Sequence, residues 1–275
     1  MSVLSWIINK MIKSIDFSKF SSFKIGSVVD VKILEDCSDY RDDYYLIGSC
    51  NNTLISDNPP PLIKLSKKYD YIKIEDNLLK IGALTPSGKI ASFCKKHNIA
   101  NFEFISHLPG TLGGLVKMNA GLKEFEIFNN LVYINTCTQK RYKKDIVFGY
   151  RYTDINEPIL EAVFNLEYGF DEQKVMMFKK MRLNQPKKPS AGSCFKNPQG
   201  DYAGRLIEAV GLKGIRIGDM EFSEVHANFL VNNGNGTFED AIYLIKEAKK
   251  RVYEKFNIKL ELEIEVLDKN WLEKL

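Results

Sequence analysis

The glycine-rich segment at residues 108–121 constrains the fold of this chain more than any other feature. Its four glycines, with Pro109, Thr111 and Asn119, allow the backbone to form a concavity whose N–H groups bind an anion. The glycine spacing differs from the lysine-containing mononucleotide loop and from the strand-to-helix dinucleotide fingerprint, and no clear helix pattern follows it. We therefore predict a phosphate-binding loop outside a doubly wound nucleotide fold, with a purely structural glycine loop as the alternative.

A second segment, at residues 46–57, repeats this composition more weakly. A short apolar run ends at Gly48, small polar residues follow it, and a second apolar run follows them. Two such loops can hold the two phosphates of a diphosphate.

The order of strand and helix patterns indicates an α+β protein. The segment 28–34 alternates and is β-branched, and 71–75 and 78–82 form a strand pair around Asp76-Asn77. Thr85 and Pro86 are expected as the N-cap and first residue of a helix. Strands before and after this helix favour two open or split units over a barrel, with a boundary near residues 168–171. Further strands are expected at 45–48, 131–135, 160–168, 227–232 and 259–267, and further helices at 171–184, 203–210 and 237–256.

Composition indicates a soluble globular protein. The 275 residues are 44% hydrophobic and 27% charged, and no apolar run approaches the roughly 20 residues of a membrane span. The apolar residues 1–10 lack a basic leader and a small-residue cleavage site, so no export signal is expected. This segment is either a packed N-terminal helix or an extension ahead of an internal start at Met11.

The cysteines, histidines and charges exclude several classes of site. Five cysteines lie without a close pair, which predicts neither a zinc site nor a disulfide framework and fits a reducing cytoplasm. Three histidines far apart in sequence give no support for a metal. In the basic run 179–188, five of ten residues are Lys or Arg, which fits either a solvated helix end or a local field that attracts a diphosphate. No aromatic-basic motif supports nucleic-acid binding.

The segment 190–198 combines a hydroxyl, a cation and an amide within nine positions. Gly192 permits a positive φ, and Pro189 and Pro198 end regular structure on both sides. We therefore expect Ser193 on a turn, with an ordinary polar loop as the alternative.

These segments, in their order, resemble the UDP-N-acetylenolpyruvoylglucosamine reductase (MurB) family. The resemblance extends from about Phe17 onward, and the short connection from Arg151 to Ser193 is similar to the family's second type. Serine and cysteine follow Gly48 where the family usually has consecutive glycines, and Cys194 replaces an aromatic residue. Besides the loops above, the motifs that carry the resemblance are Gly149-Tyr-Arg-Tyr-Thr153, Arg182-x-x-Gln-Pro186, Ala203-Gly204, Gly211-Leu-Lys-Gly214, His226-Ala-Asn-Phe229 and Leu260-x-x-Glu263.

The resemblance implies an α+β fold with a two-part FAD-binding domain of the vanillyl-alcohol-oxidase/MurB type and a C-terminal α+β substrate-binding domain. The implied division is 1–60 and 61–170 for the two FAD-binding subdomains and 171–275 for the substrate-binding domain, whose last strand carries Glu263. The implied enzyme is a flavoprotein of peptidoglycan precursor synthesis, for which we expect a cytoplasmic location and favour a monomer over an oligomer. It transfers a hydride from NADPH through FAD to the enolpyruvyl ether of UDP-N-acetylglucosamine. Another FAD oxidoreductase of the same fold, or a non-catalytic nucleotide-sugar binding module, is the alternative.

The same resemblance implies roles for individual residues. Ser193 matches the general acid, Arg151 the cation at the substrate carboxylate, and Glu263 the catalytic glutamate. On alternation alone, Glu263 would be one of three acids on a solvated strand face, and His226 would be a structural histidine as readily as a ligand. Implied substrate-binding residues are Tyr150, Lys196, Asn197, His226 and Asn228. Implied cofactor-binding residues are Gly48, Ser49, Cys50, Asn51, Asn52, Thr53, Pro109, Gly110, Thr111, Gly113, Gly114, Asn119, Ala120 and Gly121.

Overall fold

The computed structural model of the chain describes residues 12–271, so the expectations for residues 1–10 lie outside the described part. The described residues form two compact units, each assembled from separate pieces of the chain. Unit 1 contains residues 31–48 and 62–183, and unit 2 contains 14–30, 49–61 and 184–271. The division at residues 60 and 170 stays a prediction about domains.

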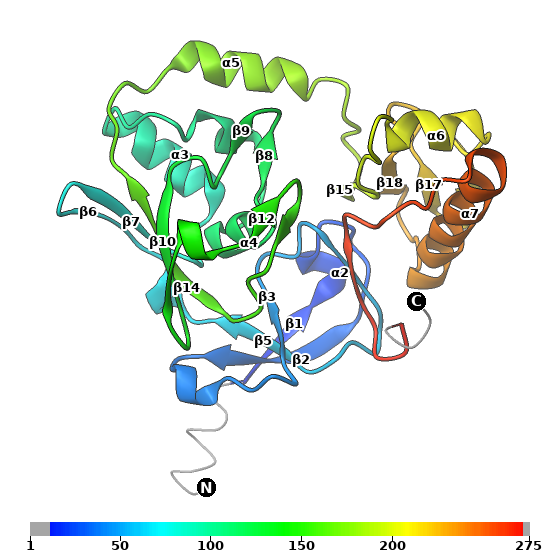
Figure 1. Ribbon diagram of the computed structural model, residues 1–275. Helices are drawn as coiled ribbons and strands as arrows, with labels where there is room; N and C mark the ends of the chain where they lie inside the picture. The colour runs from blue at the N-terminus through cyan, green and yellow to red at the C-terminus, as the bar shows by residue number, and fades with distance from the viewer. Residues whose placement is uncertain (1–11, 272–275) are drawn as a thin grey trace, which may run out of the picture. The chain divides into compact units, whose positions relative to one another are not determined.

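Unit 1 is built around a five-stranded antiparallel sheet of order β11-β10-β14-β7-β6 (Figure 1). The predicted pair at its edge is confirmed, because β6 and β7 are joined by Asp76 and Asn77 with φ of 54° and 59°. Two consecutive positive φ angles are the geometry of the tightest hairpin turn. The strands are β6 (Ile72–Glu75), β7 (Leu78–Gly82), β10 (Leu131–Thr136), β11 (Lys140–Tyr142) and β14 (Ile159–Asn165).

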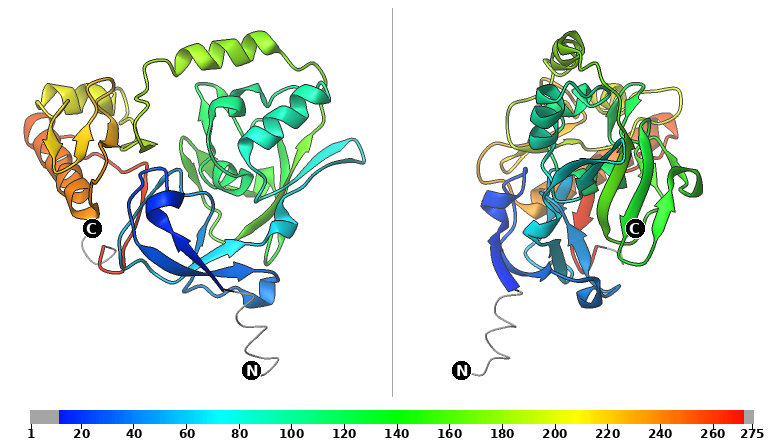
Figure 2. Two further views of the ribbon diagram at one scale, coloured as in Figure 1. Left: turned by 180° about the vertical axis from the view of Figure 1, so that it is seen from behind. Right: turned by 90° about the vertical axis from the view of Figure 1, so that its left-hand side faces the viewer.

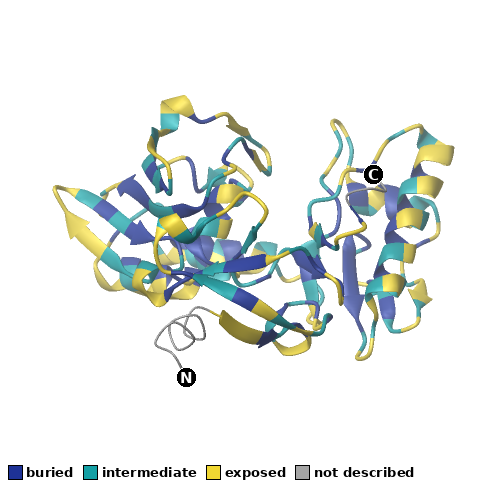
Figure 3. Cartoon of the chain, turned by 90° about the horizontal axis from the view of Figure 1, so that it is seen from below, coloured by how far each residue is buried: buried dark blue, intermediate teal, exposed yellow. Residues whose placement is uncertain are grey.

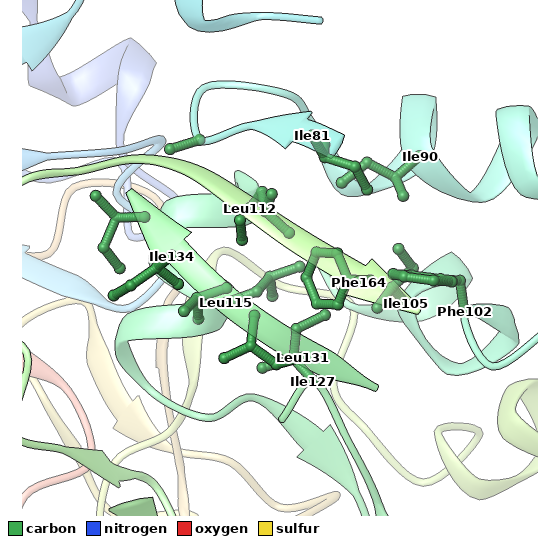
Figure 4. Close-up of a cluster of buried hydrophobic side chains, with 14 of the residues drawn as sticks. Ile81, Ile90, Phe102, Ile105, Leu112, Leu115, Ile127, Leu131, Ile134 and Phe164 are labelled. Carbon is green, nitrogen blue, oxygen red and sulfur yellow. The ribbon is translucent and has the colours of Figure 1, made fainter. Parts of the chain in front are cut away.

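Helices α3 (Ser87–Lys96) and α4 (Leu112–Lys117) pack their apolar side chains against this sheet. Ile90 of α3, Leu112 of α4 and Phe164 of β14 lie together in the core (Figure 4). Both views in Figure 2 show α3 beside the sheet. The predicted start of α3 was wrong by one residue: Pro86 is the N-cap, and the Thr85 hydroxyl instead donates to the Tyr71 carbonyl at 3.0 Å.

Three parallel strands, β2 (Val28–Leu34), β5 (Leu62–Leu65) and β3 (Tyr45–Ile47), pair with β5 in the middle, and β2 belongs to unit 1 from Val31 onward. β3 ends immediately before Gly48 and so delivers the first predicted loop. Cys37 and Cys137 form a disulfide within this unit, which corrects the expectation of no disulfide. The two cysteines are 100 residues apart, so sequence spacing carried no signal of the pair.

Unit 2 contains the antiparallel sheet β15-β18-β17-β16, whose strands are β15 (Ser190–Ser193), β16 (Arg216–Ile217), β17 (Met220–Phe222) and β18 (Phe229–Asn232). Helices α6 (Ala203–Ala209) and α7 (Phe238–Phe256) pack apolar residues into the same core. Thr237 and Asp240 form a capping box that starts α7 as predicted. One face of α7 is buried and the other exposed (Figure 3).

The predicted last strand, 259–267, is mostly wrong. Only β19 (Glu265–Leu267) is a strand, and it pairs in parallel with β4 (Thr53–Ile55). Residues 261–264 instead form backbone hydrogen bonds with the segment that follows Ser193, so they do not extend the pairing of β19 with β4.

The remaining elements are short, apart from α5. They are β1 (Ile12–Asp16), α2 (Phe17–Phe20), η1 (Cys37–Asp39), η2 (Lys67–Tyr69), η3 (Glu103–His107), β8 (Gly121–Leu122), β9 (Phe125–Glu126), η4 (Lys143–Asp145), β12 (Phe148–Gly149), β13 (Tyr152–Thr153) and α5 (Glu172–Met181).

Within residues 12–271 no helix is long and apolar enough to cross a membrane, and no group of three or more His, Cys, Asp or Glu residues is placed to hold a metal ion.

Candidate active site

The predicted glycine loop of unit 1 contains a helix that the sequence did not reveal. α4 begins at Leu112, directly after Thr111, and Gly113-Gly114 in its first turn hide it from a propensity-based prediction. The amides of Leu112 and Gly113 donate to the carbonyls of Thr85 and Ala83 at 2.9 and 2.8 Å. A Cβ on Gly113 would lie 3.2 Å from the Cβ of Ala83. Glycine is therefore needed here partly for close packing on the strand end.

The two predicted loops meet at Gly48 and Thr111. A Cβ on Gly48 would lie 2.9 Å from the Thr111 hydroxyl oxygen, whereas a Cβ on Gly114 would meet nothing within 4 Å. The ammonium of Lys64 donates to the Gly48 carbonyl at 2.6 Å. This part of the unit offers glycine backbone, the Thr111 hydroxyl and the nearby ammonium of Lys64. Together these groups form a donor set that fits the diphosphate of a flavin dinucleotide. Sequence reasoning missed Lys64, whose only signal was a cation in the otherwise apolar strand β5.

Asn119 joins the glycine loop to the β12–β13 hairpin. Its side chain is fully buried, and its amide donates to Glu126 Oε2 at 2.8 Å and to the Gly149 carbonyl at 3.1 Å. Its Oδ1 accepts from the amide of Phe128 at 3.3 Å. Both amide protons are therefore engaged within the protein, and cofactor binding by Asn119 stays a prediction.

Arg151 occupies the turn between β12 and β13 with a φ of 54°. Such a conformation is uncommon for a residue with a side chain and is found often at functional sites. One Nη of its guanidinium donates to the Gly121 carbonyl at 2.8 Å, and the guanidinium lies 5.1 Å from the ring centroid of Tyr150. These contacts fix the plane of the guanidinium, which is the group best shaped to receive a carboxylate.

In unit 2, Ser193 lies at the end of a strand, β15, and the predicted turn is wrong. The expected positive φ at Gly192 is confirmed at 83°. Ser190 and Ser193 pair with Val231 and Phe229, so β15 has one residue more than its partner between the two pairs. A bulge of this kind redirects a side chain at the end of a strand, and here that side chain is the half-buried Ser193.

The backbone holds Glu263 beside Ser193. The Glu263 amide donates to the Cys194 carbonyl at 2.9 Å, and the Lys196 amide donates to the Glu261 carbonyl at 2.9 Å. The side-chain amide of Asn52 donates to the Glu263 carbonyl at 2.8 Å. Glu263 is half-buried, whereas Glu261 and Glu265 are exposed. The structure thus separates Glu263 from the two acids that alternation grouped with it.

Asn228 fixes the residues that follow Ser193. Its Oδ1 accepts from the Phe195 amide at 3.0 Å, its Nδ2 donates to the Phe195 carbonyl at 2.8 Å, and its own carbonyl accepts from the Cys194 amide at 2.7 Å. The Asn228 amide donates to Nδ1 of His226 at 3.3 Å, and burial lowers the pKa of His226. The neutral imidazole of His226 accepts this hydrogen bond and thereby positions the loop that contains His226 and Asn228.

Two further residues have structural tasks of their own. Cys194 is fully buried, and burial together with the charge of Glu263 raises the pKa of its thiol, so it packs as an unreactive apolar residue. Asn197 is exposed, and its Oδ1 accepts from the Ala203 amide at 3.1 Å, at the start of α6.

Comparisons with known proteins agree with this arrangement. Residues 185–267 match the family described as UDP-N-acetylenolpyruvoylglucosamine reductase, C-terminal domain. The UDP-N-acetylenolpyruvoylglucosamine reductase of Campylobacter jejuni strain RM1221 is 46% identical, over 92% of this chain and 99% of its own length. The chain belongs to the UDP-N-acetylenolpyruvoylglucosamine reductase family. The resemblance found in the sequence is thereby confirmed.

Two other relatives extend the comparison. The reductase of Helicobacter pylori strain J99 is 42% identical over 92% of this chain and 98% of its own length. The crystal structure of the UDP-N-acetylenolpyruvylglucosamine reductase MurB from Thermus caldophilus matches with a TM-score of 0.82 and 27% identity, over 93% of this chain and 98% of that chain. The α+β fold of the MurB type is therefore confirmed.

Proposed function

We propose that this chain is an FAD-dependent reductase that transfers a hydride from NADPH to the enolpyruvyl ether of UDP-N-acetylglucosamine. The product is UDP-N-acetylmuramate, a precursor of peptidoglycan. The names of the relatives support this reaction. The observation in this chain that carries the proposal is the hydrogen bond from the Glu263 amide to the Cys194 carbonyl, which keeps a hydroxyl and a half-buried carboxylate on adjoining segments.

The loops of unit 1 fit the cofactor that this reaction requires. FAD, when bound, supplies a carrier that accepts a hydride from one substrate and passes it to the next. Pro109, Gly110, Thr111 and Gly114 present backbone and a hydroxyl, and Lys64 holds the carbonyl of Gly48 so that this turn keeps its shape. The remaining cofactor-binding assignments are part of this proposal: Ser49, Cys50, Asn51, Asn52, Thr53, Gly113, Asn119, Ala120 and Gly121.

Arg151 stabilises the charge that develops on the substrate. Hydride addition to the terminal methylene of the enolpyruvyl group leaves negative charge on the α-carbon and its carboxylate. A guanidinium fixed before the reaction lowers the barrier without having to reorganise. The hydrogen bond to the Gly121 carbonyl supplies this fixation.

Ser193 then donates a proton to the α-carbon. A serine hydroxyl is a weak acid, so its neighbours must orient it and restore its proton. Glu263 orients the intermediate. Lys196, whose ammonium lies 3.7 Å from Glu261 Oε2, is the nearby cation on the same segment. Lys196, Asn197 and Tyr150 bind the sugar nucleotide, whereas the contacts of His226 and Asn228 favour a positioning role for that pair.

The proposal includes organisation and location. Residues 1–60 and 61–170 form the FAD-binding subdomains, and 171–275 form the substrate-binding domain. The enzyme takes two small-molecule partners in turn, NADPH and UDP-N-acetyl-enolpyruvylglucosamine. It acts as a monomer in the cytoplasm.

Substitution of Ser193 tests the assignment. In stopped-flow absorbance, Ser193→Ala should leave FAD reduction by NADPH unchanged and should slow reoxidation by the enolpyruvyl substrate at least about a hundredfold. Ser190→Ala, on the same strand, is the matched control and should leave both steps near wild-type rates. Equal slowing of both steps in Ser193→Ala would contradict the assigned role.

A further inference from the structure

The backbone of Glu263 is held by a hydrogen bond on each side of its Cα, and both bonds lie within unit 2. The Glu263 amide donates to the Cys194 carbonyl at 2.9 Å, and the Glu263 carbonyl accepts from Nδ2 of Asn52 at 2.8 Å. The two bonds fix the two planar peptide groups that meet at this Cα, and with them its φ and ψ. The direction in which the Glu263 side chain leaves the backbone therefore depends on Asn52 as well as on the segment of Ser193.

Asn52 is the stronger hold on the peptide that follows Glu263. The nitrogen of this peptide belongs to Ile264 and lies 3.5 Å from the Cys194 carbonyl oxygen, which is long for a hydrogen bond, whereas the bond from Asn52 measures 2.8 Å. The Asn52 carbonyl also accepts from the Glu265 amide at 2.8 Å. Asn52 therefore contacts the chain on both sides of Ile264, once with its side chain and once with its backbone.

The loop that carries Asn52 is itself held in place. Cys50 is buried with a φ of 50°, and its carbonyl accepts from the Ser22 amide at 3.1 Å. The side-chain amide of Asn51 donates to the Ser49 hydroxyl oxygen at 2.7 Å. β4 begins directly after Asn52 and pairs with β19. A donor on a backbone restrained in this way can hold its acceptor in one position.

We propose that Asn52 is a positioning residue for Glu263. Its side-chain amide fixes the peptide after Glu263, which holds the carboxylate in the direction from which it orients the reaction intermediate. The proposal rests on the proposed function, because it concerns the catalytic role assigned to Glu263. It gives the Asn52 side chain a task separate from the cofactor-binding role assigned to its loop. Such a contact affects the rate because a displacement of about 1 Å can slow a reaction about a hundredfold.

The first test removes the donor in the FAD-loaded protein. In stopped-flow absorbance, Asn52→Ala should leave FAD reduction by NADPH unchanged and should lower the limiting rate of reoxidation by UDP-N-acetyl-enolpyruvylglucosamine about tenfold. The substrate concentration that gives half of this rate should stay within about twofold, because the intermediate loses its orientation and the bound substrate does not. Asn58→Ala, at an exposed position of the same segment, is the matched control and should react as wild type does. Asn52→Ser, whose hydroxyl is too short to replace the amide, has the same expected result and serves if Asn52→Ala does not fold.

A double-mutant cycle shows whether Asn52 acts through Glu263. Glu263→Gln keeps the backbone contacts and removes the carboxylate, and its slow reoxidation is followed by anaerobic manual mixing. Asn52→Ala should slow reoxidation about tenfold in the wild-type chain but less than about twofold in the Glu263→Gln chain, because the group that it positions is then already missing. A further tenfold loss in the double variant would mean that Asn52 acts elsewhere and would overturn the proposal.

The outcomes separate this contact from the proposed function. If reduced wild-type protein is not reoxidised by the substrate, the proposed function fails and the positioning role fails with it. If wild type reacts and Asn52→Ala reacts equally fast, only the positioning role fails. Weaker FAD binding by Asn52→Ala in a fluorescence titration, with unchanged reoxidation of the loaded protein, would make Asn52 a cofactor contact and would also overturn the proposal.

Discussion

Asn228 offers the sharpest test of how the catalytic segment is held. Asn228→Ala removes two buried hydrogen bonds to Phe195, at 3.0 and 2.8 Å, and leaves the Phe195 amide and carbonyl without these partners. Each lost bond contributes about 1 kcal/mol, and the buried groups left unpaired add a further penalty. We expect the free energy of unfolding to fall by about 2–4 kcal/mol, near the upper end for single substitutions.

Urea unfolding of the apoprotein, followed by circular dichroism, measures this loss. Asn228→Asp should be at least as damaging, because it removes the donor to the Phe195 carbonyl and places a carboxylate beside that carbonyl. The exposed Asn58→Ala is the matched control and should change stability by less than about 0.5 kcal/mol. If Asn228→Ala unfolded at the urea concentration of the wild type, Asn228 would not fix the Ser193 segment, and the positioning role assigned to it would be refuted.

Three further substitutions have distinct expected results. Arg151→Lys replaces a fixed planar group with a flexible point charge, so stopped-flow absorbance should show reoxidation by the substrate slowed at least about tenfold and reduction by NADPH unchanged. Gly48→Ala brings a Cβ to 2.9 Å from the Thr111 hydroxyl oxygen, so FAD binding should weaken by about 1–2 kcal/mol in a fluorescence titration. The hydrogen bonds from Arg205 lower the pKa of Asp201 to about 2, below the ordinary value of about 3.9. The ionised pair therefore stabilises the fold above about pH 4, and this stabilisation is lost as the pH falls to 2. In acid titrations by circular dichroism, the stability difference between wild type and Asp201→Asn should therefore shrink over that range.

Each of these expectations has a contrary outcome. Equal slowing of both half-reactions in Arg151→Lys would remove the carboxylate role. Unchanged FAD affinity in Gly48→Ala would mean that the Thr111 side chain moves aside without cost to the cofactor loop. A stability difference for Asp201→Asn that stayed constant from pH 7 to pH 2 would exclude a contribution from the ionised carboxylate.

Local patterns predicted the elements whose causes are local. The β6–β7 hairpin follows from Asp76-Asn77, which accept positive φ, between two alternating segments. The start of α7 follows from the capping residues Thr237 and Asp240. In both cases the residues that determine the structure lie within a few positions of each other, so the sequence contains the whole signal.

The wrong predictions concern parts of the structure that are determined by contacts between segments far apart in the sequence. Ser193 lies on a strand because β18 pairs with it, although glycine and polar residues around it favour a turn. Residues 261–264 leave the predicted strand because the Cys194 and Lys196 backbone groups bond to them. The Cys37–Cys137 disulfide joins positions 100 residues apart. None of these pairings can be read from spacing along the chain.

For the candidate site, the sequence indicated the motif residues but not the contacts that support them. The types and order of the motif residues indicated Arg151, Ser193 and Glu263 through their resemblance to a family. The structure added Lys64 at the Gly48 carbonyl and the two hydrogen bonds between the Asn228 side chain and the Phe195 backbone. Such supporting contacts depend on packing, because a lysine in a strand or an asparagine in a loop has no distinctive pattern.

The most direct test of the proposed function is an anaerobic half-reaction with the purified holoprotein. FAD bound to the wild-type chain is first reduced by NADPH, and UDP-N-acetyl-enolpyruvylglucosamine is then added without oxygen while the flavin absorbance is recorded. We predict full return of the oxidised flavin spectrum, with one UDP-N-acetylmuramate formed per flavin. A flavin that NADPH reduces but this substrate leaves reduced would contradict the account.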